Sequence, residues 1–94
     1  MSGVSQDLSD ILLDLYSANS ARHVYECATD LPLDDLFFVG GRLQSLIRKA
    51  EMALVTYEQN HFFFDAYAIA TLKARLHEAK EFRRYIVKRI RNGF

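Results

Sequence analysis

The chain has 94 residues, half of them apolar, and its 12 Lys and Arg side chains balance 12 Asp and Glu side chains. This length predicts one domain, residues 1–94, and the low content of Gly and Pro excludes a disordered or turn-rich β protein. A neutral chain also lacks the strong positive charge of a typical nucleic-acid-binding domain. A domain this small buries only about 60–65 % of its unfolded surface, so it gains stability by oligomerising.

The first segment, residues 6–28, has the apolar spacing of a helix, with Asn19–Ser20 as the place where the pattern allows a break. One face carries Leu8, Ile11, Leu12 and Leu15, and another carries Asp7, Asp10 and Asp14. The single cysteine, Cys27, excludes an intramolecular disulfide. Its helical surroundings predict a small buried side chain rather than a reactive thiol.

Pro32, in the sequence TDLPLDD, marks the start of a second helical segment, because proline disfavours helix at the preceding residue. The residues that follow alternate at intervals of four and three, which is typical of a coiled-coil seam: Leu36, Gly40, Leu43, Ile47, Ala50, Leu54, Tyr57 and His61. Gly40–Gly41 has two interpretations. Either the pair ends a short helix that began at Leu33, or Gly40 lets a second helix approach closely. The cost of about 1 kcal/mol per helical Gly relative to Ala favours the break.

The last segment keeps helical spacing up to Asn92–Gly93, a typical C-terminal stop. The chain is expected to turn near residues 59–64, where Asn60 suits a helix end and Asp65 suits a helix start. We therefore predict an all-α fold: a small antiparallel bundle of three helices, with a long helical hairpin at its C-terminal side. The rival arrangement has one unbroken central helix through residue 61 and completes the bundle only in a dimer.

Glu58 and His61 form a Glu-x-x-His pair, which is half of a di-iron carboxylate pattern. The other histidines do not complete it, since His23 would lie ~27 Å away from His61 along the bundle axis at 1.5 Å per residue. The sequence HEAKE, residues 77–81, lacks the second histidine of a zinc protease helix. The sequence also contains neither a Gly-rich phosphate loop nor a GxSxG elbow. We therefore expect no metal site, no cofactor and no enzymatic activity.

Charge is distributed unevenly along the chain. Residues 1–35 carry seven acids and one base, a net of −6, whereas residues 73–94 carry eight bases and two acids, a net of +6. The helical repeat gathers most of these bases into a basic face: Lys73, Lys80, Arg84, Lys88 and Arg91, with His77 among them. The favoured interpretation is a solvated or internally paired face, with Glu26, Asp30, Asp34 and Asp35 as the neutralising acids. The alternatives are contact with an acidic protein or with nucleic acid.

Two aromatic clusters are the strongest functional feature. Phe62, Phe63, Phe64 and Tyr67 form one, and Phe37 with Phe38 forms the other. Adjacent residues of a helix cannot all point inward, so some rings are expected at the surface, where aromatic side chains commonly anchor protein interfaces.

These patterns predict a small non-catalytic protein-binding regulator, inhibitor or assembly factor that acts through the surface of a helical bundle. Its partner is another protein, and a homodimer is expected. The alternative is a nucleic-acid-binding regulator that uses the basic face. No apolar run approaches the eighteen residues of a membrane span, and the acidic start does not resemble a signal peptide. We therefore expect a cytoplasmic protein without a membrane partner.

Overall fold

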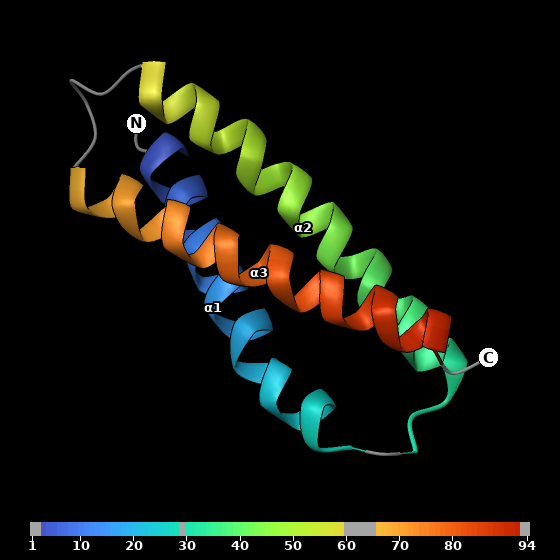
Figure 1. Cartoon of the computed structure of the whole chain (residues 1–94). Coiled ribbons are helices and arrows are strands. Elements are labelled where there is room, and N and C mark those ends of the chain that lie inside the picture. Colours follow the sequence, from blue (N-terminus) through green and yellow to red (C-terminus); the bar gives the residue numbers. More distant parts are fainter. Residues whose placement is uncertain (1–2, 29, 60–65, 93–94) are drawn as a thin grey trace.

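The computed structural model describes residues 3–28, 30–59 and 66–92, with side chains from Leu8 onward. These residues form three helices: α1 (Gly3–Cys27), α2 (Leu33–Gln59) and α3 (Ala66–Asn92). Within the described ranges there is no strand, so the predicted all-α class with three packed helices is confirmed (Figure 1). The molecule is elongated, measuring 48 × 19 × 18 Å.

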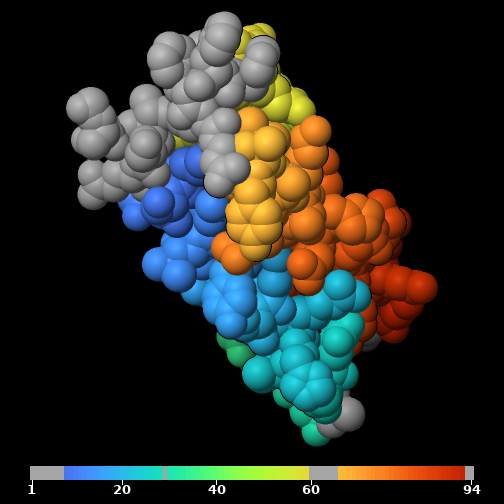
Figure 2. Space-filling model, turned by 90° about the vertical axis from the view of Figure 1, so that its left-hand side faces the viewer, coloured from blue at the N-terminus to red at the C-terminus, as the bar shows by residue number. Residues whose placement is uncertain are grey.

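The two long helices α2 and α3 lie side by side, and α3 runs back along α2 (Figure 1). Contacts pair Glu58 with Lys73, Glu51 with Lys80, Gln44 with Arg83, and Gly40 with Ile86. α1 and α3 run in the same direction. Leu12 of α1 contacts Arg75 of α3, and Tyr25, later in α1, contacts Arg89, later in α3. Figure 2 shows α1 in blue to cyan beside α3 in orange to red on one face of the molecule.

A continuous apolar core joins the three helices. The buried side chains on α2 are those of the predicted seam, Leu36, Leu43, Ile47, Ala50 and Tyr57. They meet Leu8, Ile11 and Leu15 of α1 and Leu72, Leu76, Ala79, Phe82 and Ile86 of α3. Burying a large apolar side chain stabilises the fold by about 1.5–3 kcal/mol. This core therefore fixes the positions of the three helices relative to one another.

α2 continues through Gly40–Gly41, so the favoured expectation of a helix break is wrong. A Cβ atom on Gly40 would lie 3.5 Å from Cγ2 of Ile86, whereas one on Gly41 would meet nothing within 4 Å. Gly40 therefore faces α3, as the alternative interpretation has it. Leu36 and Leu43 are buried on either side of the glycines, and this tertiary packing outweighs the unfavourable helix propensity.

The helix boundaries follow local sequence signals. The carbonyl of Pro32 accepts hydrogen bonds from the amides of Asp35 (3.1 Å) and Leu36 (3.3 Å) and so opens α2. Asp34 and Asp35 lie in its first turn, where carboxylates favour the helix dipole. α1 ends at Cys27, close to its predicted end, and it does not break at Asn19–Ser20. The predicted turn at 59–64 falls almost entirely outside the described residues, which end at Gln59 on this side.

Polar contacts hold α1 against α3 at two levels. Near the middle, Arg75 Nη1 donates to the carbonyl of Leu12 (2.9 Å), and Asn19 Nδ2 donates to the carbonyl of Arg75 (3.1 Å). Near the end of α1, Arg89 Nη1 donates to the carbonyls of Tyr25 (3.0 Å) and Ala28 (2.9 Å). The second contact satisfies carbonyls that a helix C-terminus otherwise leaves without partners.

Candidate functional site

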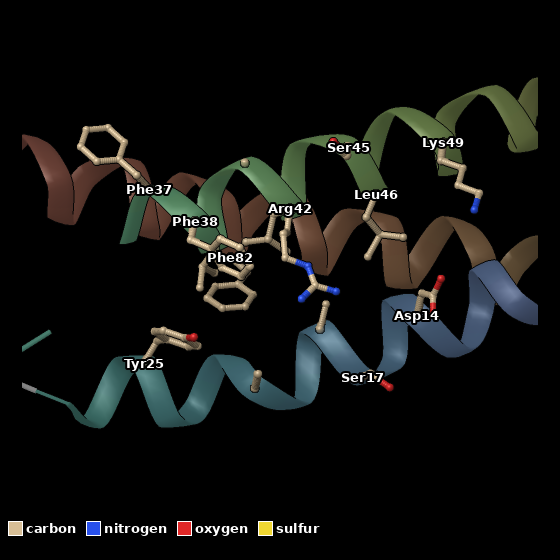
Figure 3. Close-up of a pocket in the computed structure, with 15 residues that line it drawn as sticks. Asp14, Ser17, Tyr25, Phe37, Phe38, Arg42, Ser45, Leu46, Lys49 and Phe82 are labelled. Carbon is tan, nitrogen blue, oxygen red and sulfur yellow. The ribbon is translucent and has the colours of Figure 1, made fainter. Parts of the chain in front are cut away.

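An open groove of about 860 Å³ runs between α1 and α2. Figure 3 shows Phe82 of α3 behind the space between the two helices, where its buried ring helps to form the floor. The ring centroid of Tyr25, on α1, lies 5.8 Å from that of Phe82, so an aromatic pair closes one end of the floor. The apolar core is therefore packed beneath the groove, and the opposite side of the groove is open.

The two walls of the groove differ in the size of their side chains. The α1 wall is formed mainly by small residues, Ser17, Ala18 and Ala21, with Asp14 and Tyr25 at its ends. The α2 wall carries the larger side chains of Phe38, Arg42 and Lys49, with the small Ser45 between the last two. Small side chains on one wall leave room for another backbone to approach.

The charged side chains of the groove make no ion pairs within the described part of the chain. The guanidinium carbon of Arg42 lies 5.6 Å from the ring centroid of Phe38, on the same helix. Lys49 projects from α2, and Asp14 projects from the opposite wall (Figure 3). Two cations and one carboxylate thus line the groove without an ion-pair partner among the described residues.

Large apolar side chains are exposed in the groove and elsewhere on α1 and α2. Phe38 is 62 % exposed, and Leu13 and Val24 are 61 % and 64 % exposed on the turns of α1 that carry Ser17 and Ala21. Met52 is 72 % exposed and follows Lys49 by three residues on α2. Among these side chains Phe38 is the one that lines the groove, where an exposed ring can serve as an anchor for a binding partner.

Of the predicted aromatic residues in the described ranges, Phe37 and Phe38 line the groove, and both are exposed. Tyr67 is 77 % exposed in the first turn of α3, at the opposite end of the bundle from Phe38 (Figure 1). Phe62, Phe63 and Phe64 lie outside the described residues. Of the cluster that contains Tyr67, the structure thus places Tyr67 alone, and Tyr67 does not line the groove.

The predicted basic face is largely paired within the chain. Lys73 pairs with Glu58 at 2.8 Å, Lys80 with Glu51 at 2.7 Å and Arg84 with Glu81 at 2.9 Å. Lys88 and Arg91 form no ion pair with other described residues. The neutralising acids are thus on α2 and α3, whereas the predicted Asp30, Asp34 and Asp35 make no ion pair within the described ranges. Glu26 instead pairs with Arg22.

The Glu-x-x-His pair can be described only at Glu58. Glu58 is engaged by Lys73, and its sequence partner His61 lies outside the described residues. No group of three His, Cys, Asp or Glu side chains suited to a metal occurs in residues 8–28, 30–59 and 66–92. Cys27 is exposed, contrary to the expected burial, and its Sγ lies 3.6 Å from Nε2 of His23.

Comparison with known proteins found no matching family model, no matching curated protein and no matching solved structure. No helix in the described ranges has the length and apolar character needed to cross a membrane.

Sequence reasoning missed the groove itself, including Arg42, Lys49 and Tyr25. The signal that points to it lies in α1, where Leu12 and Leu13, adjacent in sequence, begin two apolar stripes on different sides of one helix. One stripe continues into the core through Leu15, and the other continues on the outside through Val24. A helix that is apolar on two sides indicates a second packing surface.

Proposed function

We propose that the protein is a small non-catalytic protein-binding regulator, inhibitor or assembly factor that acts as a homodimer through the surface of its helical bundle. The observation that carries this proposal is the groove between α1 and α2, where the mostly exposed side chain of Phe38 lies beside a floor formed by the core. Apolar anchors beside a preformed groove are the usual basis of helix-in-groove recognition between proteins.

The shape of the groove favours a protein over a small molecule as its occupant. It is an open groove along residues 14–25 of α1 and 37–49 of α2, whereas small-molecule sites enclose most of the ligand surface. The small wall at Ser17, Ala18 and Ala21 suits the close approach of another helix. Arg42 and Lys49 add cations that favour a carboxylate-bearing partner.

Nucleic-acid binding receives less support. Three of the five side chains of the basic face are held in ion pairs, so their charge is already compensated. Contact with a phosphate backbone would require those pairs to exchange for phosphates, and the neutral chain supplies no long-range attraction.

The test is affinity capture of tagged protein from a lysate of its own cells, with and without nuclease, read by mass spectrometry. We expect the wild type to recover a protein partner in both arms. Phe38→Asp should reduce that recovery at least about tenfold, because it places a charge among the apolar anchors while leaving the core untouched. The double substitution Arg84→Glu with Lys88→Glu is the matched control and should leave recovery unchanged.

Two outcomes would count against the proposal. Recovery that disappears on nuclease treatment and with the Arg84→Glu/Lys88→Glu control would favour the nucleic-acid alternative. Recovery that is equal for wild type and Phe38→Asp would show that the groove is not the binding surface.

A further inference from the structure

We infer that the groove between α1 and α2 is filled by α1 of a second copy of this chain, so that two copies form a two-fold dimer with their α1 helices in opposite directions. The inference rests on the proposed function only in taking the groove as a protein-binding surface. Three features of the described residues support this occupant: the two-sided apolar character of α1, the order of its outward side chains, and the charges of the two walls.

α1 is apolar on its outer side as well as on its core side. Ile11 and Leu15 are buried, yet Leu13 and Val24 on the other side are more than half exposed. In Figure 2, α1 crosses the lower part of the visible face with no other helix in front of it. A helix with apolar side chains on both sides is typically packed on both sides, and the described parts of α2 and α3 pack against its core side.

The order of side chains along the outer edge of α1 suits pairing with an identical helix. Leu13, Ser17, Ser20 and Val24 follow at intervals of four, three and four residues, which places them on one side. Two large side chains thus flank two small ones. Reading the helix in the opposite direction gives the same order of sizes and the same intervals. In an oppositely directed pair, Leu13 meets Val24 of the other copy, and the serines meet in the middle. Ala21, beside them on the groove wall, leaves further space for close approach.

The charges at the groove are complementary between two copies. Asp14 lies on the α1 wall, whereas Arg42 and Lys49 lie on the α2 wall, seven residues and so two turns apart on one side of that helix. None of the three forms an ion pair within the described residues. When α1 of a second copy enters the groove, its Asp14 is carried toward Arg42 and Lys49 of the first, and the two-fold axis repeats the contact. Each copy therefore supplies both the acid and the bases.

The resulting dimer buries apolar surface that is exposed in the isolated chain. The exposed apolar edge and the floor at Phe82 become the centre of a four-helix layer made from α1 and α2 of both copies. A chain of 94 residues buries a smaller share of its surface than a larger domain does, so this burial adds to its stability.

The test uses charge reversal and complementation in the full-length chain. Sedimentation equilibrium at about 0.1 M salt, where the Debye length is about 10 Å, measures the dimer dissociation constant of each protein. Asp14→Lys forms one variant, and Arg42→Glu with Lys49→Glu forms the other. Glu78→Lys, on an exposed position of α3 without an ion pair among the described residues, is the control for adding the same charge. Circular dichroism verifies that every variant keeps its helices.

We expect the wild type and Glu78→Lys to be dimers of similar affinity. Each groove variant alone should raise the dissociation constant at least about tenfold, because like charges then face one another at both symmetric contacts. An equimolar mixture of the two groove variants should restore association to within about threefold of the wild type, since each mixed dimer has only opposite charges in contact. Changes acting within one copy cannot produce this rescue.

A monomeric wild type across the accessible concentrations would overturn the inference, as would a dimer that both groove variants leave unchanged or a mixture that fails to recover. The two proposals fail separately. A monomer that still captures a partner protein through Phe38 would remove the homodimer from both proposals and leave the partner-binding part of the proposed function intact. A rescued dimer that captures no other protein would support the dimer and contradict a regulatory role.

Discussion

The two faces of α2 differ in how completely they are packed. Toward α3, Leu43, Ile47 and Ala50 are buried in a closed seam, and ion pairs such as Glu51–Lys80 flank it. Toward α1, the same helix presents Phe38 and Arg42 to an open groove. One side of α2 is thus packed against another helix, whereas another side borders an open groove.

The difference shows what holds the fold and what remains available for contact. The closed side follows the heptad spacing of large apolar residues, which α3 matches with Leu72, Leu76 and Phe82. On the open side, α1 offers Ser17, Ala18 and Ala21, which are too small to fill the distance to α2. Stability should therefore be concentrated on the α3 side, whereas association should depend on the α1 side.

The largest expected contrast is between two phenylalanines. Phe82→Ala should lower the free energy of unfolding by about 3–5 kcal/mol, because its ring is fully buried between the helices. Phe38→Ala should change that free energy by less than about 0.5 kcal/mol, since the ring is mostly exposed. Urea unfolding at equal low protein concentration compares them. Equal losses would contradict the distinction between the two sides.

A smaller loss is expected where Arg89 holds the end of α1. Arg89→Ala removes hydrogen bonds to the carbonyls of Tyr25 and Ala28, so we expect a loss of about 1.5–3 kcal/mol. Lys88→Ala, at an exposed neighbouring position without an ion pair among the described residues, should stay within about 0.5 kcal/mol of the wild type. Thermal unfolding followed by circular dichroism measures both. A harmless Arg89→Ala would show that the end of α1 does not depend on this contact.

The two adjacent glycines of α2 lie in different surroundings: Gly40 faces α3, whereas a side chain on Gly41 would meet nothing within 4 Å. Gly41→Ala should raise the free energy of unfolding by about 1 kcal/mol, because the new methyl group meets nothing within 4 Å and helix propensity improves. Gly40→Ala should also be tolerated, since its methyl group would lie 3.5 Å from Ile86, an ordinary contact. Urea unfolding of both variants is the measurement. A destabilised Gly40→Ala would mean that α2 and α3 approach more closely than this.

The smallest expected effect belongs to the ion pairs beside the closed seam. A double-mutant cycle of Glu51→Ala and Lys80→Ala should give a coupling of about 0.2–1 kcal/mol, because both side chains are nearly half exposed. Repeating the cycle at 1 M salt should reduce it further. A coupling that is larger and insensitive to salt would identify the pair as a main source of stability rather than a flank of the apolar seam.

Periodicity alone predicted the class, the position of all three helices and most of the core, because Leu36, Leu43, Ile47 and Tyr57 mark one face of α2 regardless of context. The helix break at Gly40–Gly41 was wrongly predicted because propensity is local, whereas packing against Ile86 is tertiary. The groove was not predictable from the spacing of α2, since its existence depends on how far the small residues of α1 lie from Phe38 and Arg42. Of the predicted aromatic anchors in the described residues, Phe37 and Phe38 line this site and Tyr67 does not.

The most direct test of the open side is hydroxyl-radical footprinting of the intact protein over a range of concentrations. Phe38 and Phe82 are compared within the same sample, so the buried ring serves as the internal reference. If the groove is a protein-binding surface that a second copy fills, labelling of Phe38 should be strong in dilute solution and fall as association proceeds, while Phe82 stays protected throughout. Labelling of Phe38 that remains strong at every concentration and in the presence of captured partner would contradict the proposal that this groove is where the protein binds.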